Sequence, residues 1–326
     1  MTDLSPPPSR HPSVGIFERL PPLSWRRSDD PGLIRVRGPD ARSFLQSQLS
    51  NDVAQVSATQ SQLSGYCGPK GRLLAVFTVL QLESPDSFGL ELPVELLPAT
   101  LKRLRMFVLR SKLVLDDAGA DWPALALAGP GAAEALQRLD LSVPGESLTT
   151  ATGDDMLIVR RPGVWPRYLL RAAPERLAAI EQALAALPPL SADHWRLAEL
   201  LAGVPVVRAA TVEHFVPQTV DLDLAGGISF SKGCYPGQEI VARVHYLGRL
   251  KQRLHLARCD HPAAAGQSVR PDLADGPAVG EVMDSAPLPD GGYLLSLSLQ
   301  LDREPTTGLH LDGEPKSPLR EIEPAH

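Results

Sequence analysis

Cysteine is scarce in this sequence, and no metal or cofactor motif accompanies the few cysteines present. The 326 residues include three, Cys67, Cys234 and Cys259, and no two of them stand in a CxxC spacing. This argues against a disulfide framework and against a zinc ribbon. The sequence also lacks the glycine-rich patterns of dinucleotide- and phosphate-binding loops and the HExxH pattern of zinc proteases. We therefore predict no metal site built by this chain alone.

Long apolar runs are missing as well. No stretch approaches the roughly 18 residues of a membrane-spanning helix, and the opening stretch MTDLSPPPSR lacks the basic and apolar regions of a signal peptide. We therefore expect a cytoplasmic protein that does not contact a membrane. The net charge of −6 is not typical of proteins that coat nucleic acids, so direct nucleic-acid binding is not expected.

The length of the chain and the distribution of its apolar residues predict more than one folding unit. Residues 1–18 are rich in proline and serine, and we expect a disordered tail there. Residues 19–249 alternate between strand and helix patterns, whereas residues 250–326 carry short strand patterns separated by proline, glycine and aspartate. This predicts a large α+β domain followed by a small C-terminal β-barrel, with a loose tail after about residue 303.

Within the α+β region, a strand–helix–strand–strand–helix order occurs twice, which predicts two related α+β subdomains. Predicted strands and helices of the first copy lie at 33–38, 39–49, 64–82, 88–92, 93–107 and 111–117. Those of the second copy lie at 124–130, 131–139, 156–160, 167–172 and 174–187, and a further helix at 192–203 ends at Gly203. We interpret GPKGR at 68–72 as a hairpin turn rather than a phosphate-binding loop.

The stretch KGCYPGQE at 232–239 places one cysteine between two glycines. Most isolated cysteines are small buried hydrophobic residues. Here Pro236 suits the first position of a helix through GQEIVARVHY, which would put Cys234 at a helix N-terminus and close to Lys232. Both features favour the thiolate, and the flanking glycines permit close approach of a ligand. On this local reasoning a functional thiol and a space-filling one both stay open.

The longer segment HFVPQTVDLDLAGGISFSKGCYPGQEIVARVHYLGRLKQRL at 214–254 resembles the YgfZ family. That family is a folate-binding branch of the glycine-cleavage T-protein fold and includes iron–sulfur assembly factors. Supporting stretches are GPDARSFLQSQLSNDV at 38–53, CGPKGRLL at 67–74, VLRSKLVLDD at 108–117 and LAGVPVV at 201–207. The resemblance spans roughly residues 30–300, and it implies two α+β folate-binding subdomains around a central channel, followed by a small β-barrel.

The same resemblance implies the site residues and the cofactor. KGCYPGQEIVAR looks like the family signature, and it carries over Cys234 as the chemically active thiol. The residues that it carries over to the ligand site are Lys232, Gly233, Tyr235, Gly237, Gln238, Glu239 and Arg243. Trp195, just before LAGVP, matches a tryptophan associated with folate, and a second such tryptophan would fall near Pro31. The implied cofactor is tetrahydrofolate or a related reduced folate.

Two functions of different classes fit this resemblance. The first is a folate-binding accessory protein that supports assembly or repair of iron–sulfur enzymes, including enzymes that modify tRNA. Its partners would be iron–sulfur proteins or their assembly factors. A thiolate suits an iron–sulfur cluster, but one cysteine cannot hold a cluster alone, so any cluster would be shared with a partner. This favours an interaction protein over a conventional enzyme.

The alternative is a folate-dependent aminomethyl- or methyltransferase like the T-protein itself. T-proteins carry carboxylates on a strand where this sequence has Ala75 and Val76, and a pterin-binding glutamate where it has Leu169. Apolar side chains neither accept a hydrogen bond from a pterin N–H nor move a proton. The sequence therefore favours the accessory function over the transferase.

Overall fold

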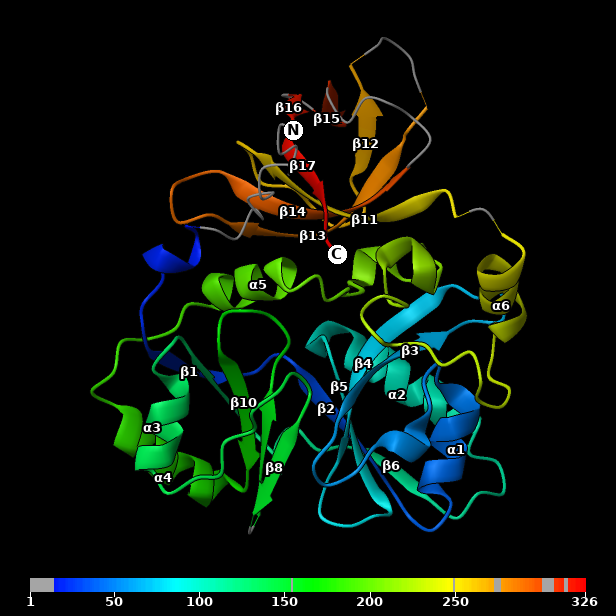
Figure 1. The fold of residues 1–326 in the computed structure, drawn as a ribbon. Helices are drawn as coiled ribbons and strands as arrows, with labels where there is room; N and C mark the ends of the chain where they lie inside the picture. The colour runs from blue at the N-terminus through cyan, green and yellow to red at the C-terminus, as the bar shows by residue number, and fades with distance from the viewer. Residues whose placement is uncertain (1–14, 154, 249, 273–276, 301–307, 314–315) are drawn as a thin grey trace, which may run out of the picture.

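The computed structural model describes residues 15–326 except 154, 249, 273–276, 301–307 and 314–315. Two α+β subdomains lie side by side, and a seven-stranded, barrel-like sheet lies above them, with helix α5 (Ala192–Leu201) in between (Figure 1). This confirms the predicted α+β class, the two related subdomains and the C-terminal barrel. No described helix combines the length and the hydrophobicity that crossing a membrane requires.

The first subdomain is an antiparallel sheet in the order β3–β4–β5–β2–β6, with two helices. Its elements are β2 (Gly32–Arg37), α1 (Ala41–Gln48), β3 (Gln62–Cys67), β4 (Leu73–Gln81), β5 (Ser87–Leu92), α2 (Leu97–Met106) and β6 (Val114–Asp117). The Gly68 amide donates to the Arg72 carbonyl at 2.8 Å, which closes the turn between β3 and β4. The hairpin interpretation of GPKGR is therefore confirmed.

The second subdomain is an antiparallel sheet in the order β1–β7–β10–β9–β8. Its elements are β1 (Ser24–Ser28), β7 (Ala124–Ala128), α3 (Ala132–Arg138), β8 (Thr150–Gly153), β9 (Met156–Arg160), β10 (Arg167–Ala172) and α4 (Pro174–Leu184). Strands β1 and β8 were not predicted. Both are short and polar, so their sequences carry little apolar alternation, and their pairing partners stabilise them instead.

Strand β1 precedes the first subdomain in the chain but belongs to the sheet of the second. The chain therefore crosses between the subdomains directly after β1, through Asp29, Asp30 and Pro31. Of the predicted tail at 1–18, residues 1–14 lie outside the described residues. Ile16 is buried, and Phe17 begins a short 3₁₀-helix, so the end of that predicted tail packs against the fold.

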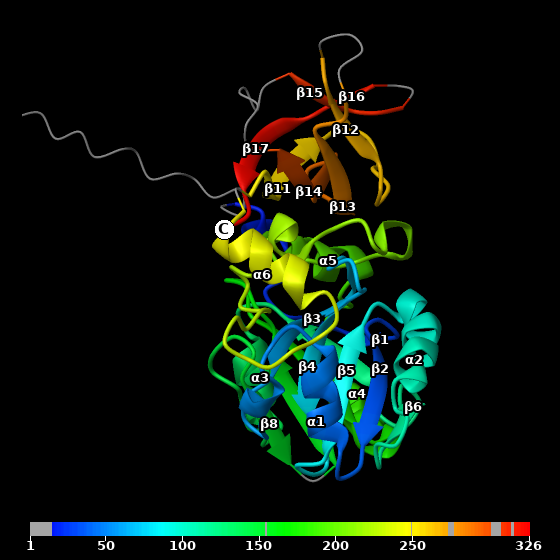
Figure 2. The ribbon, with the colours of Figure 1, turned by 90° about the vertical axis from the view of Figure 1, so that its right-hand side faces the viewer.

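The C-terminal sheet has the strand order β16–β15–β12–β13–β14–β11–β17 (Figure 2). Its strands are β11 (Gln252–Cys259), β12 (Ser268–Pro271), β13 (Gly280–Pro287), β14 (Tyr293–Gln300), β15 (Leu309–Leu311), β16 (Ser317–Pro318) and β17 (Arg320–Pro324). The prediction of a loose tail after about residue 303 is wrong for the described residues there. These short strands extend the sheet at both edges. Leu309 and Leu311 of β15, and Leu319 between β16 and β17, are buried, and the mostly polar composition of the segment conceals them.

One apolar core joins the barrel to the first subdomain. Leu197 and Leu200 of α5 belong to the same buried cluster as Met283 of β13 and Leu254 of β11, and that cluster continues into the first sheet. Helix α5 packs directly on β13. The predicted boundary between residues 249 and 250 therefore separates two segments of the chain that share a core.

A buried ionic cluster joins the two subdomains to each other. Glu91 of β5 accepts hydrogen bonds from Arg171 Nε of β10 at 2.6 Å and from Arg161 Nη1, just after β9, at 2.9 Å. The side chains of Glu91 and Arg171 are 1% and 2% exposed. Arg171 also donates to the carbonyls of Trp122 and Pro31 at 2.8 and 2.7 Å. This cluster therefore fixes how the two sheets face each other.

We expect Glu91→Ala to lower the free energy of unfolding by about 3–5 kcal/mol, because it leaves two buried guanidinium groups without their carboxylate. Urea denaturation followed by circular dichroism measures this. The matched control is Glu134→Ala, whose ion pair with Arg138 is well exposed, and it should cost less than about 1 kcal/mol. Equal losses in the two variants would contradict this account of the cluster.

Candidate functional site

A cavity of about 280 Å³ lies between the two subdomains and against α5. The crossover from β1 to β2 forms one wall, and strands of the first sheet form another. Residues from both subdomains and from α5 line it, among them Asp30, Val76, Glu91, Arg161, Trp195 and Glu199. Ligand sites commonly lie at such interfaces between domains. The cavity is therefore the first candidate for the predicted folate site.

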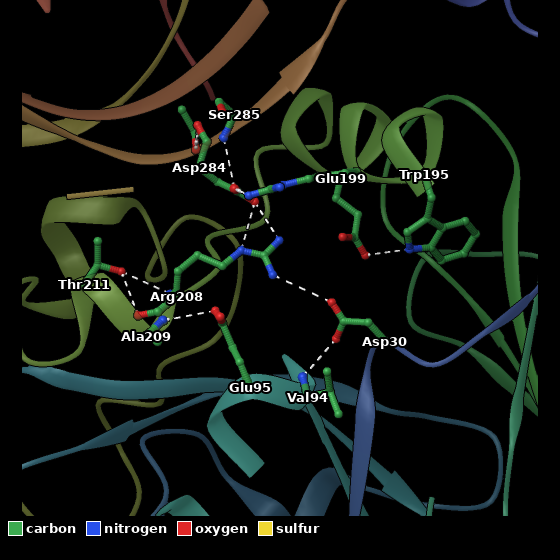
Figure 3. Close-up of polar contacts among 12 residues, drawn as sticks. Asp30, Val94, Glu95, Trp195, Glu199, Arg208, Ala209, Thr211, Asp284 and Ser285 are labelled. Carbon is green, nitrogen blue, oxygen red and sulfur yellow. Dashed lines mark hydrogen bonds and ion pairs between the residues drawn. The ribbon is translucent and has the colours of Figure 1, made fainter. Parts of the chain in front are cut away.

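Trp195 and Glu199 stand four residues apart on α5, so both side chains point to the same face of the helix. Trp195 Nε1 donates to Glu199 Oε1 at 3.1 Å (Figure 3). The Arg167 guanidinium lies over the indole ring, 5.0 Å from its centroid. The predicted folate-associated tryptophan thus lines the cavity, in an orientation that a carboxylate and a guanidinium hold.

Two buried arginines lie next to this pair, and one of them, Arg161, lines the cavity. Arg161 Nη2 lies 3.6 Å from Glu199 Oε1, and Arg167 Nη1 lies 3.8 Å from the same atom. Arg167 is almost completely buried, and this burial lowers its pKa to about 9. The Nε atoms of Arg161 and Arg167 have no hydrogen-bond partner among the described residues. The carboxylate of Glu199 therefore faces two guanidinium groups whose donors are not all used.

Asp30 enters the cavity from the crossover. Its Oδ1 accepts from the Val94 amide at 3.0 Å, and its Oδ2 lies 3.7 Å from Arg208 Nη1 (Figure 3). Burial raises the pKa of Asp30, and the nearby charge of Glu199 acts in the same direction. Arg208 opposes this shift, but burial is the larger effect.

The barrel contributes a buried carboxylate above the cavity. Asp284 of β13 accepts from Arg208 Nη2 at 2.8 Å (Figure 3). It also pairs with Arg196 of α5. Arg196 and Arg208 themselves line the cavity. One aspartate of the barrel therefore positions two of the cavity's arginines.

The predicted signature lies elsewhere. Its first five predicted site residues belong to the loop at 227–237, the signature loop, and Gln238, Glu239 and Arg243 belong to α6 (Gln238–Tyr246). Lys232 Nζ donates to the carbonyls of Gln46 and Leu49 at 2.6 Å each and to that of Asn51 at 3.1 Å. Burial lowers the pKa of Lys232 to about 8. The ammonium thus ties the signature loop to the end of α1.

Gly237 lets this loop meet the β3–β4 turn. Its φ is +79°, and a Cβ there would lie 2.5 Å from the Gly68 carbonyl oxygen and 2.6 Å from Gly71 Cα. Any larger residue would therefore clash with backbone atoms. Tyr235 is buried beside this contact, with its ring 5.4 Å from Lys232 Nζ, and burial raises the pKa of its hydroxyl.

Cys234 is exposed on this loop. The helix prediction is wrong in detail, because α6 begins at Gln238 rather than at Pro236. Pro236 and Gly237 form a turn instead, and the left-handed conformation of Gly237 keeps the helix from extending toward Cys234. Cys234 therefore stands four residues before the helix rather than at its first turn.

The structure does not bring the predicted site residues to one place. Of the nine, Trp195 lines the cavity, whereas the eight residues of the signature are absent from its walls. Gln238 is used locally, since its Oε1 accepts from the Tyr235 amide at 3.2 Å. Gly233, Glu239 and Arg243 are exposed. A direct role of the signature residues in binding folate stays a prediction.

Sequence reasoning missed the polar residues that line the cavity, among them Asp30, Glu91, Arg161, Arg196, Glu199 and Arg208. Two signals were present in the sequence. Glu91 interrupts an apolar strand, and a charge there is rarely buried without a partner. Glu199 follows Trp195 by one helical turn. Among the described residues, no group of three or more His, Cys, Asp or Glu side chains is placed to hold a metal ion.

Comparison with known proteins gives the family. No family model matches the sequence. The chain is 33% identical to the "tRNA-modifying protein YgfZ" of Edwardsiella ictaluri (strain 93-146), over 97% of this chain and 96% of that protein. It is 30% identical to the protein of the same name from Sodalis glossinidius (strain morsitans), over 89% of each. The chain belongs to the YgfZ family. The resemblance that the KGCYPGQEIVAR segment indicated is thereby confirmed.

This member of the YgfZ family also has the predicted T-protein fold. The aminomethyltransferase T of the glycine cleavage system from Bartonella henselae matches it with a TM-score of 0.75, over 94% of this chain and 87% of that chain. The two sequences are 16% identical, so this match establishes the shared fold and no more.

Lys232→Met should loosen the signature loop, because three backbone carbonyls lose the ammonium that donates to them. The substitution keeps most of the side-chain volume. The Ser229 amide, which donates to the Ser50 carbonyl at 3.0 Å, reports on this loop. We expect its hydrogen exchange to accelerate about tenfold or more. Arg243→Met removes the same charge from an exposed position nearby and should leave this rate unchanged. Similar exchange in both variants would contradict the anchoring role.

Proposed function

We propose that this protein is a folate-binding accessory protein that supports the assembly or repair of iron–sulfur enzymes, with Cys234 as its functional thiol. The observation that carries the proposal is the cavity between the subdomains, which holds an oriented tryptophan and a carboxylate, together with an exposed thiol on the signature loop. The ligand site and the thiol are separate features, which suits a protein that binds folate and contacts a partner.

The cavity residues fit tetrahydrofolate or a related reduced folate. Trp195 offers an aromatic surface to a pterin ring, and Glu199 offers hydrogen-bond acceptors. Arg26 also lines the cavity and forms no ion pair with any described residue, so it is available to the glutamate carboxylates of the ligand. A bound reduced folate would supply one-carbon chemistry, and the protein would supply its orientation and its protection from solvent.

Cys234 is the accessible one of the three cysteines. Cys67 and Cys259 are buried, and burial raises the pKa of both thiols, that of Cys67 to about 12. A buried neutral thiol neither ligates iron nor exchanges with a partner, whereas an exposed thiol can do both. This supports a role for Cys234 as a transient cluster ligand or as a redox thiol.

The partners follow from this chemistry and from the relatives. We propose iron–sulfur proteins or their assembly factors as partners, since one cysteine needs further ligands to hold a cluster. The relatives are named as tRNA-modifying proteins, so we include iron–sulfur enzymes that modify tRNA among the clients. A cytoplasmic location suits an exposed free thiol, because the cytoplasm keeps such thiols reduced.

The transferase alternative gains no support from the cavity wall of β4. Val76 lines the cavity at one of the positions where a T-protein would carry a carboxylate, and Ala75 is buried. Carboxylates reach the cavity from other elements, but Glu91 is neutralised by two arginines. We therefore retain the accessory function.

Isothermal titration with tetrahydrofolate tests the ligand. Trp195→Phe should weaken binding roughly 3- to 10-fold, because the ring that meets the pterin shrinks and its N–H is lost. Trp122→Phe is a matched control, since Trp122 is equally buried and also donates to a glutamate, Glu83, but lies outside the cavity. The folate proposal fails if the unmodified protein shows no heat at millimolar ligand.

A complementation assay tests the thiol. In a strain lacking the protein, Cys234→Ala should fail to restore the activity of iron–sulfur enzymes while it folds normally, because an exposed thiol adds little to packing. Its affinity for tetrahydrofolate should be unchanged. Cys259→Ala, which removes a buried thiol from the barrel, should restore activity at a small cost in stability. Full rescue by Cys234→Ala would exclude a chemical role for this thiol.

A further inference from the structure

The carboxylate of Glu199 is only partly used by the protein. Its Oε1 accepts from Trp195 Nε1 and lies within 3.8 Å of both Arg161 and Arg167. Its Oε2 forms no hydrogen bond with any described residue, although the side chain lines the cavity and is 19% exposed. Oε2 is not one of the fully buried atoms that lack a partner among the described residues, so it is accessible from the cavity to water or to a ligand.

The neighbouring side chains compensate the negative charge of the Glu199 carboxylate and fix its orientation. The guanidinium groups of Arg161, which also pairs with Glu91, and of Arg167 lie within 3.8 Å of Oε1, and the indole N–H donates to the same oxygen. The side chain is therefore held in one orientation before any ligand arrives, which reduces the entropy lost on binding. Such a preorganised acceptor is suited to a ligand that presents N–H donors.

The other carboxylates of the cavity are less available. Glu91 uses both oxygens on Arg161 and Arg171. Asp30 uses one oxygen on the Val94 amide and has the other beside Arg208, and burial raises its pKa. Asp193 lies in the first turn of α5 and is exposed. Glu199 is therefore the cavity carboxylate best placed to accept hydrogen bonds from a ligand.

We infer that Glu199 recognises the 2-amino-4-oxopyrimidine edge of a reduced folate, and that Arg161 and Arg167 are its positioning residues. This inference rests on the proposed folate function. The edge carries two donors, the ring N3–H and the 2-amino group, and Oε2 of Glu199, to which no described residue donates, can accept from them. Trp195 lies beside Glu199 on the same helical face, so one element would supply both the acceptor and the aromatic contact.

The test compares two ligands on two proteins. The ligands are tetrahydrofolate and its 2-desamino-2-methyl analogue, which lacks one donor of the recognised edge. Glu199→Gln keeps an oxygen for Trp195 Nε1 but offers an amide group, with its own N–H donors, to the ligand. We expect the unmodified protein to prefer tetrahydrofolate by roughly 10- to 100-fold in Kd, and Glu199→Gln to lose most of that preference.

The preference is a ratio measured within one protein, so a general loss of stability does not produce the expected result. Asp193→Asn is the matched control, because it removes the same charge from the same helix at the cavity, and it should keep the preference. If Glu199→Gln does not fold, the unmodified protein still decides: equal affinity for the two ligands overturns the inference.

The outcomes separate this inference from the function on which it rests. If the unmodified protein binds neither ligand, the folate function is wrong and the inference falls with it. If tetrahydrofolate binds but Glu199→Gln keeps the preference for it, the folate function stands and the role of Glu199 is wrong.

Discussion

The buried contact of Glu91 with Arg161 and Arg171 is the interaction on which the rest of the structure depends. It joins a strand of the first sheet to residues of the second, and the cavity exists because these two sheets are held face to face. Arg161 carries the same network on to Glu199. An unpaired charge buried between the two sheets is very costly, so these residues must stay paired. The same ion pairs therefore hold the two subdomains together and set the shape of the cavity.

A second ionic contact links the cavity to the barrel. Asp284 holds Arg196 and Arg208, and Arg208 also approaches Asp30 on the opposite wall. The barrel is therefore more than an appended domain, because its aspartate sets the position of cationic side chains that a ligand would meet. The signature loop is attached by different means, through the Lys232 ammonium and the close approach of Gly237 to the β3–β4 turn. Cys234 is thus presented at a distinct surface on a loop that the first subdomain supports.

Local patterns predicted those elements that have strong apolar periodicity. Strands β2, β5, β7 and β10 are buried along most of their length, and their sequences show it. The prediction failed at β1, β8 and the last three strands, which are short. Of these, β1, β15 and β17 pair with strands far away in the sequence, whereas β8 and β16 pair with neighbouring strands. The start of α6 was predicted at Pro236 because proline suits the first position of a helix. The left-handed conformation of Gly237 prevents this, and the helix begins at Gln238.

By itself the sequence determined the family, the α+β class, the barrel and the importance of the KGCYPGQE segment, because these depend on local order and on a contiguous motif. The sequence also indicated Trp195 as a candidate site residue, through the resemblance to the family. Only the tertiary structure decided that Trp195 shares a cavity with Asp30, Glu91 and Arg208, and that Cys234 does not line it. The physical reason is that buried charges are tolerated only in pairs, and the two members of each pair here come from segments that folding alone brings together.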